Sequence, residues 1–106
     1  MIRKREMEKI KLFCEKNNLI HMHEFIDVKH MDADMSNHIV TLKRGGVDVI
    51  TLEKRTYYDF NCDTISIIWV TIDINDVEGY CDNINMSLEY IKRKVENNVA
   101  KENWKN

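Results

Sequence analysis

Residues 64–75 read TISIIWVTIDIN, and their apolar side chains alternate as in a β-strand. The alternate positions from Ile68 to Ile74 are β-branched, and we expect this parity to face the main core. Ahead of them the phase reverses at Ile67, which indicates either a β-bulge or a strand covered on both faces over its middle. Trp69 favours the second option, because an indole is a large apolar group to leave on an open sheet face. We therefore predict that this segment is the central strand.

The chain has 106 residues, which suits one domain with a single core. Its 43% hydrophobic and 32% charged residues are ordinary for a globular protein. No apolar run approaches the roughly 18 residues that span a bilayer, and no signal peptide is recognisable. Cys14, Cys62 and Cys81 suggest neither a disulfide framework nor a zinc motif. We expect a cytoplasmic protein without a membrane segment or a cofactor.

The first half of the chain predicts a helix, a strand and a loop. Residues 3–17 carry an apolar stripe at helical spacing, and Asn17-Asn18 is a suitable helix stop. Residues 19–28 alternate as a strand, with His21 and His23 on one of its faces. Residues 30–37 are polar and unpatterned, so we predict a loop. The helical stripe consists of Met7, Ile10, Phe13 and Cys14.

A hairpin is predicted around Gly45-Gly46, between strands at 38–42 and 47–53. A two-residue turn would place Val40 and Leu42 on the face of Val47 and Val49. A three-residue loop with a glycine bulge would place them with Ile50 and Leu52, and we prefer this register because it segregates apolar from polar residues better. The second strand is expected to continue to Phe60 and to turn at residues 61–63.

The last helix is predicted over residues 76–101, where apolar residues recur at spacings of three and four. Asn75 with Glu78 three positions on resembles a capping box. Tyr80 and Tyr90 would then lie on this helix, and Trp104 beyond it. The positions that we expect to be buried are Val77, Cys81, Ile84, Leu88, Ile91, Val95 and Val99.

These elements predict a single α+β domain over residues 1–106, in the order α-β-β-β-β-α. We expect an antiparallel sheet of three or four strands, because short turns rather than helices join them, with the helices packed on one face. Residues 1–2 and 102–106 are expected to fray.

Charge is distributed unevenly along the chain, whose net charge is -2. Residues 56–91 contain seven acids and no lysine or arginine, whereas residues 1–17 carry six basic and three acidic groups. Carboxylates on a rigid sheet and a helix end can imitate a row of phosphates and bind a basic groove. The predicted partner-binding residues are the acids Asp59, Asp63, Asp73, Asp76, Glu78 and Asp82 and the tyrosines Tyr57, Tyr58 and Tyr80.

His21-Met22-His23 followed by a later tyrosine resembles the arrangement of the HUH single-strand nucleases. In that family two histidines on one strand face hold a divalent cation, and a helical tyrosine attacks the phosphodiester. The resemblance implies His21 and His23 as metal ligands and Tyr90 or Tyr80 as the nucleophile. The sequence departs from the family in having only a helix before the histidine strand.

Two further groups of residues resemble chemical sites. His30, Asp32, Asp34 and His38 combine histidine with carboxylate and so suit a transition metal, although Asp and Ser in a loop also satisfy local backbone donors. The opening of this segment resembles a calcium loop, but Lys43 stands where an EF-hand needs glutamate. Asp48 and Glu53 have opposite parity on one strand, which excludes a carboxylate-lysine nuclease site.

Our leading hypothesis is a small non-catalytic binding protein, an inhibitor or accessory factor that contacts a nucleic-acid-handling protein through the acidic residues. Anti-CRISPR proteins often use acidic residues to imitate nucleic acid, and we compare the chain with them by analogy only. The alternatives are the metal-dependent HUH-type nuclease and a nucleic-acid-binding module that uses basic groups of the terminal helices. A protein partner with a basic surface is expected ahead of nucleic acid, and the exposed sheet edges also suggest a homodimer.

Overall fold

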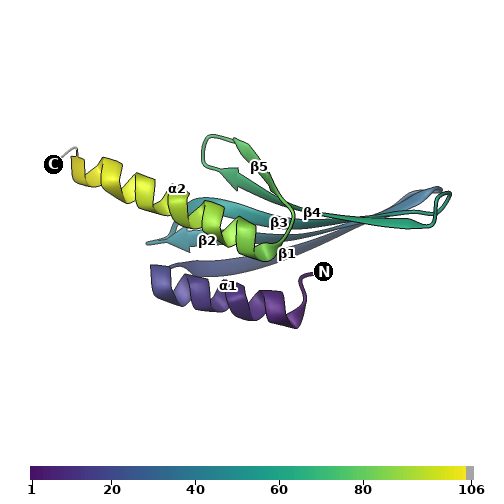
Figure 1. Ribbon diagram of the computed structural model, residues 1–106, viewed down its shortest axis with the longest axis horizontal. Helices are drawn as coiled ribbons and strands as arrows, with labels where there is room; N and C mark the ends of the chain where they lie inside the picture. The colour runs from purple at the N-terminus through teal and green to yellow at the C-terminus, as the bar shows by residue number, and fades with distance from the viewer. Residues whose placement is uncertain (105–106) are drawn as a thin grey trace.

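A five-stranded antiparallel sheet forms the centre of the computed structural model, which describes the backbone of residues 1–104 and the side chains of residues 1–96 (Figure 1). The predicted α+β class is confirmed, but the sheet has five strands instead of three or four. The strands follow one another in the order β1-β2-β3-β4-β5. The elements are α1 (Lys4–Asn17), β1 (Ile20–Lys29), β2 (Ala33–Arg44), β3 (Val47–Asp59), β4 (Thr64–Asp73), β5 (Glu78–Cys81) and α2 (Ile84–Trp104).

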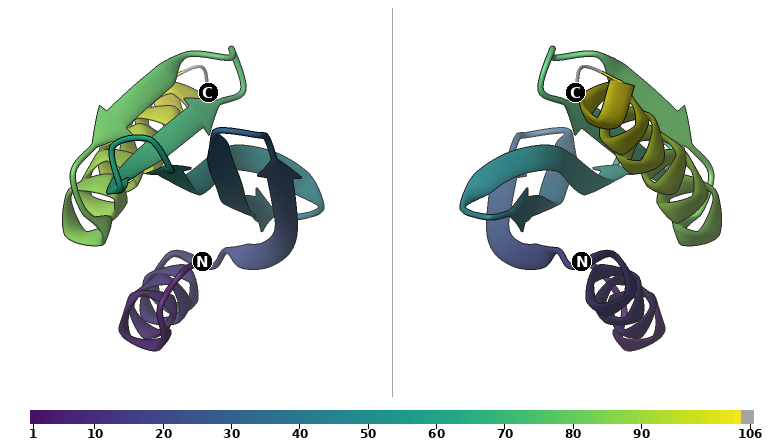
Figure 2. Two further views of the ribbon diagram at one scale, coloured as in Figure 1. Left: turned by 90° about the vertical axis from the view of Figure 1, so that its right-hand side faces the viewer. Right: turned by 90° about the vertical axis from the view of Figure 1, so that its left-hand side faces the viewer.

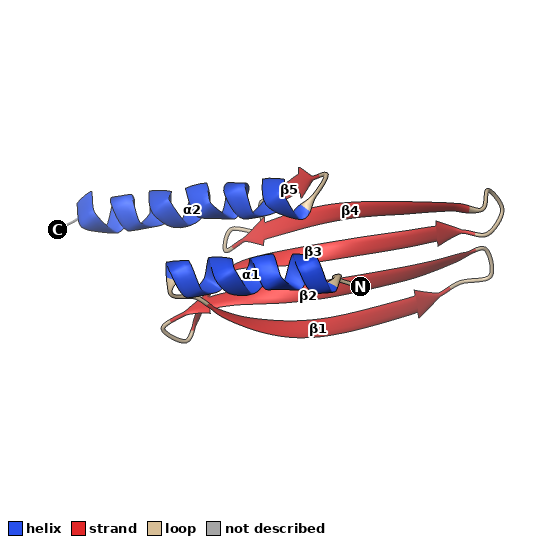
Figure 3. Cartoon of the chain, turned by 60° about the horizontal axis from the view of Figure 1, so that its bottom comes forward, coloured by secondary structure: helices blue, strands red, loops and turns tan. Residues whose placement is uncertain are grey.

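Both helices lie on the same side of the sheet, as predicted (Figure 2). They cover only one half of it, and the strands extend beyond them along the 56 Å length of the molecule (Figure 3). We call the uncovered part the outer half; it consists of residues 26–29, 33–37, 55–59 and 64–68. The side of the sheet away from the helices is called the open face.

The first helix begins one residue later than predicted and ends at the predicted residue, and its predicted apolar stripe packs on the core, with Met7 and Phe13 only partly buried. The backbone N–H of Arg3 donates to the Glu6 carboxylate at 2.8 Å, which satisfies one free donor at the start of α1. Asn18 ends the helix in the left-handed conformation at φ 55°, and the N–H of Leu19 reaches back to the carbonyl of Cys14. Ile10 and Cys14 are buried.

The core lies between the helices and the face of the sheet that carries Trp69. Our prediction that Ile68 and Ile74 share the core parity was wrong, since they are 41% and 67% exposed. Alternation shows that both faces of the strand are apolar, but it does not show which face the helices cover. Trp69 and Val70 are both buried without a register shift in β4, so the strand is covered on both faces over its middle.

Two predictions about the strands need correction. β3, not β4, is the central strand, because β5 adds a neighbour beyond β4. The loop predicted at residues 30–37 is shorter, since β2 already begins at Ala33. Residues 33–37 are polar in part, yet they pair with both β1 and β3, and these backbone hydrogen bonds outweigh the weak local pattern.

In the hairpin between β2 and β3, the apolar residues of the two strands face each other as in the register that we preferred from the sequence. Leu42 pairs with Ile50 and Val40 with Leu52, as expected. Gly45 and Gly46 both have positive φ, so the turn itself has two residues. The bulge lies one step further into the ladder, where Lys43 pairs with Asp48 and Val49 is the extra residue.

The last helix begins later than predicted, at Ile84 instead of residue 76. Asn83 caps it by accepting the N–H of Met86 at 2.9 Å, so the predicted capping box at Asn75 was wrong. Residues 78–81 form β5, and Tyr80 lies on this strand instead of the helix. Val77 and Cys81 match helical spacing by coincidence over a strand of four residues.

The remaining predicted positions of this helix divide into two groups. Ile84, Ile91 and Val95 are buried as expected, and Val77 is 51% exposed. The side chain of Val99 and the expected fraying of residues 105–106 lie outside the described residues. Fraying was also expected at residues 1–2 and 102–104. Ile2 is buried, and α2 extends to Trp104, past its predicted end at residue 101.

Candidate functional site

The open face exposes large apolar side chains from every strand. Because side chains alternate along a strand, the residues that face away from the helices are those in register with Ile68 and Val70 of β4. No helix of the described chain covers this face (Figure 3). Ile20 at the start of β1 is 65% exposed on this face. Seven further apolar residues, 38–60% accessible, are Met22, Ile26 and Val28 of β1, Met35 of β2, Tyr57 of β3, Ile68 of β4 and Tyr80 of β5.

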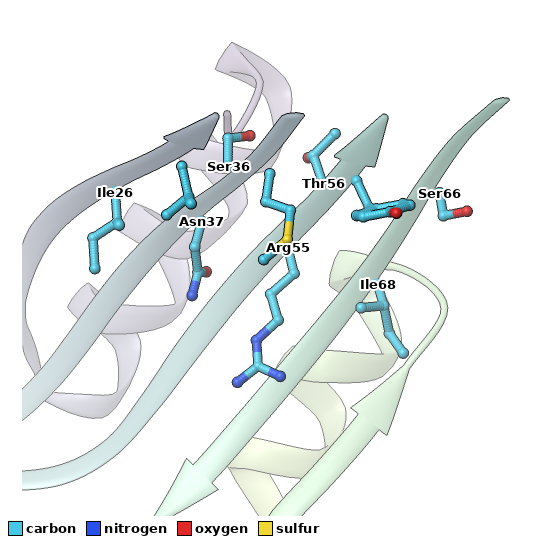
Figure 4. A pocket seen from close by; sticks show the side chains of 10 residues that line it. Ile26, Ser36, Asn37, Arg55, Thr56, Ser66 and Ile68 are labelled. Carbon is cyan, nitrogen blue, oxygen red and sulfur yellow. The ribbon is translucent and has the colours of Figure 1, made fainter. Parts of the chain in front are cut away.

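A groove of about 460 Å³ lies on the open face in the outer half. Its walls are apolar: Ile26 and Val28 come from one border strand, Met35 and Tyr57 from the two middle strands, and Ile68 from β4 (Figure 4). Ser66 adds a hydroxyl at the opposite wall. A groove with apolar walls and few polar groups is typical of binding sites.

Three polar side chains lie at the inner end of the groove. Glu53 is 5% exposed and accepts a hydrogen bond from Asn37 at 2.5 Å. Arg55 donates to the same carboxylate at 3.4 Å and keeps a 39% exposed side chain. The carbonyl oxygen of the Asn37 side chain is buried without a partner among the described residues. This cluster was missed from the sequence, because only the strand register brings Asn37 beside Glu53.

The tyrosines of the predicted site are divided between the two faces. Tyr57 and Tyr80 lie on the open face, whereas Tyr58 faces the other side. The Tyr80 hydroxyl donates to the Glu78 carboxylate, and this bond together with the carboxylate charge raises the pKa of Tyr80. The Tyr58 hydroxyl donates to Asp63 in the same way, which raises the pKa of Tyr58.

The predicted acids do not form one continuous surface. Asp59 and Asp63 lie at the β3–β4 turn, and Asp73 and Asp76 lie at the β4–β5 turn. The ten residues of β4 separate these turns by about 30 Å. The acids form two groups at opposite ends of the strand, and Asp82, directly after β5 and level with Ile68, lies between them.

Asp59 and Asp73 have structural partners within their turns. Asp59 accepts the backbone N–H groups of Asn61 and Cys62 at 2.9 and 3.2 Å. Asp73 accepts the N–H of Val77 at 3.0 Å and lies 3.6 Å from the Lys94 ammonium. The bond from Val77 is the main reason why the pKa of Asp73 is lowered. These two carboxylates stabilise turns, which leaves Glu78 as the exposed acid of the set on the open face.

The histidines form a chain of hydrogen bonds on the side of the sheet that faces the helices. His38 Nε2 lies 2.9 Å from His23 Nδ1, and His23 Nε2 lies 2.7 Å from His21 Nδ1. Burial, followed by the charges of neighbouring groups, lowers the pKa values of His23 and His38. No group of three or more His, Cys, Asp or Glu side chains within residues 1–96 is placed to hold a metal ion.

The tyrosines of the nuclease hypothesis lie away from the histidines. The ring of Tyr90 lies beside Gly79 of β5, at the opposite border of the sheet from β1. Gly79 and His23 share a row, so four strand spacings separate them, about 19 Å along the sheet. Tyr80 lies on the other face. The fold brings neither tyrosine to the histidine pair.

His30, Asp32, Asp34 and His38 are likewise spread along the sheet. His30 and Asp32 form the β1–β2 turn, and the N–H of His30 donates to the carbonyl of Ala33. Asp34 and His38 lie four residues apart on β2, about 13 Å.

The comparisons with known proteins give no assignment. No protein-family model matches the chain, and no curated protein or solved structure matches it either. Within the described chain, neither helix combines the length and the apolar character that crossing a bilayer requires.

Proposed function

We propose that the protein is a non-catalytic binding protein that holds a partner protein on the open face. One observation carries this proposal: seven large apolar side chains are 38–60% exposed on a side of the sheet that neither helix covers. Exposed apolar groups that gather on one surface are typical of interaction sites. Single exposed apolar residues would carry no such implication.

The open face is favoured over the opposite face of the outer half. On the open face the row through Val28 and Tyr57 is apolar on three of its four strands, and the next row has Ile26 and Ile68 at its two ends. On the opposite face, the cross-strand rows that contain Ile65 and Ile67 consist mostly of polar side chains. These polar side chains are Asp27, Lys29, Asp34, Ser36 and Thr56.

The energetic contribution of the apolar residues is moderate. Covering a half-exposed side chain of this size contributes about 1 kcal/mol, so the seven residues together contribute about 5–7 kcal/mol. Association costs at least about 4 kcal/mol in lost translational and rotational freedom. A stable complex therefore needs further polar contacts around the apolar centre.

Acidic residues border this apolar centre and point to a basic partner. Glu24 of β1 and Glu78 of β5 are exposed on the open face at its two borders. Arg55 lies between them and already pairs with Glu53. We propose a nucleic-acid-handling protein as the partner class, with the chain acting as an inhibitor or accessory factor, because such proteins carry the basic surfaces that this border complements.

The cysteines support a reducing compartment, and we propose the cytoplasm. All three are free thiols. Cys14 is buried, which raises its pKa to about 11 and keeps it protonated and unreactive.

The proposal is tested by comparing two lysine substitutions in affinity capture from the native host. Ile68→Lys places a charge on the open face, and Ile65→Lys makes the same change on the opposite face of the same strand. Both side chains are exposed, so both variants should fold, which circular dichroism checks. We expect the captured partner to be lost with Ile68→Lys and retained with Ile65→Lys. Equal capture by both variants would rule out the open face.

A further inference from the structure

The border strand β1 has neither a bulge nor a proline to prevent pairing with another chain. It is ten residues long and outermost in the sheet, and its pairing with β2 has no bulge (Figure 3). The chain contains no proline. Within the described residues, no bond to its outer backbone groups is found apart from its pairing with β2. Long edge strands with unpaired backbone groups are templates for strand addition.

We propose that β1 pairs in antiparallel fashion with β1 of a second copy of this chain. An antiparallel pair of identical border strands has a two-fold axis perpendicular to the sheet. Facing residues must then lie on the same side of the sheet, so one residue of β1 faces its own copy and the axis passes midway between the two. This condition leaves few registers, and the side chains of β1 distinguish among them.

The side chains of β1 favour the register centred on Phe25. Met22 of each copy then faces Val28 of the other, and the two Phe25 rings meet at the axis. Aromatic and apolar cross-strand pairs stabilise a sheet, whereas like charges directly opposite destabilise it. The adjacent register, centred on Glu24, would place two carboxylates opposite each other. The strand is therefore complementary to itself, which is why a second copy is the occupant.

The pairing would cover the free β1 border of both copies at once. Over residues 21–29 it forms about ten backbone hydrogen bonds and joins two sheets into one of ten strands. Because the axis is perpendicular to the sheet, the two open faces lie on the same side. Ile26 of each copy then faces Glu24 of the other, and Val28 faces Met22, so the apolar residues of the two open faces join into one larger surface. This inference is independent of the partner proposed above.

The mass of the protein in solution tests the pairing, measured by light scattering after size exclusion at a series of concentrations. We expect twice the mass of the chain for the wild type. Phe25→Lys should raise the dimer dissociation constant by about tenfold or more, since it places two like charges directly opposite each other at the axis. Met31→Lys adds the same charge at an exposed apolar position of the β1–β2 turn and should leave the mass unchanged. A wild type that is a monomer at every concentration overturns the proposal.

Cysteine cross-linking tests the register in a Cys62→Ser background, since Cys14 and Cys81 are buried. Phe25→Cys places two thiols about 5 Å apart across the axis, so mild oxidation should give a covalent dimer. Val28→Cys is the matched control, because its two copies stand about 20 Å apart. Cross-linking that is equal in the two variants, or faster in Glu24→Cys than in Phe25→Cys, overturns the pairing centred on Phe25.

Discussion

The Nε2 atom of His38 lies 2.9 Å from the Nδ1 atom of His23, and this contact fixes the tautomers of three histidines. The backbone N–H of Ile2 donates to His38 Nδ1 at 3.3 Å, so neutral His38 carries its proton on Nε2 and donates it to His23. His23 in turn donates through Nε2 to His21. The Nδ1 atom of each of the three rings already accepts a hydrogen bond, so protonation of a ring breaks one.

The histidine chain predicts a stability that rises with pH. The pKa values of His23 and His38 are lowered from 6.5, so the unfolded chain binds protons that the folded protein does not. We expect the free energy of unfolding to be highest above pH 6.5 and to fall as the pH drops below it. His38→Gln should flatten this slope in urea unfolding measured between pH 5 and pH 8. His30→Gln, in the exposed turn, is the control, and an equal flattening there would refute the assignment.

Glu6 and Lys54 form an ion pair beneath α1 whose loss should destabilise the protein. Lys54 is 4% exposed and donates to Glu6 at 2.7 Å, and its ammonium lies 5.4 Å from the centre of the Trp69 ring. Glu6→Gln leaves a buried ammonium without its counter-charge, and we expect a loss of about 2 kcal/mol, less than for a fully buried pair. Glu8→Gln, an exposed change on the same helix, should cost much less.

The same pair predicts an acid-sensitive component of stability. Burial alone would raise the pKa of Glu6, but the hydrogen bonds from Lys54 and from the N–H of Arg3 outweigh it and lower the pKa below 4.5. Its contribution is therefore complete above pH 4.5 and is lost as the pH falls through the lowered value. Acid unfolding of the wild type and of Glu6→Gln measures this component, which should be absent from the variant.

Gly79 is required by a close approach between β5 and its neighbours. A Cβ atom there would lie 2.8 Å from Thr71 Oγ1 and 3.1 Å from the Tyr90 ring. We expect Gly79→Ala to destabilise the protein by about 1–3 kcal/mol in thermal or urea unfolding. In a double-mutant cycle, adding Thr71→Ala should recover part of this loss. Fully additive losses would show that the contact is not the cause.

Tyr57 and Tyr58 are adjacent in sequence but lie on opposite faces, which makes them a matched pair for the binding site. If the open face holds the partner, Tyr57→Ala should weaken the complex by about 2 kcal/mol, or roughly 30-fold. Tyr58→Ala should change the affinity little. Calorimetric titration with the captured partner measures both, and a larger effect at Tyr58 would assign binding to the other face.

Strong local patterns predicted much of the fold correctly. The stripe of α1, the left-handed stop at Asn18 and the facing of Leu42 with Ile50 all follow from residues close together in the chain. β5 could not be separated from α2, because Val77, Cys81 and Ile84 satisfy helical spacing. The core face of β4 could not be chosen, since both of its faces are apolar and the helices that decide between them are distant in sequence.

The candidate site was predicted only in part. Tyr57, Tyr80 and Glu78 were expected to contact a partner, and all three lie on the open face. The groove was not expected, since it depends on the pairing of β1 with β2 and of β2 with β3. The continuous acidic surface was not found, because the length of β4 separates its two groups of carboxylates.

The most direct test of the central proposal is a nuclear magnetic resonance titration of the labelled protein with its captured partner, following backbone amides and isoleucine methyl groups. We predict that the largest changes map to Ile26, Met35, Tyr57 and Ile68 on the open face, while Ile10 and Ile91 beneath the helices stay unperturbed. Changes confined to the helices or to Ile65 and Ile67, with the open face unaffected, would contradict the account.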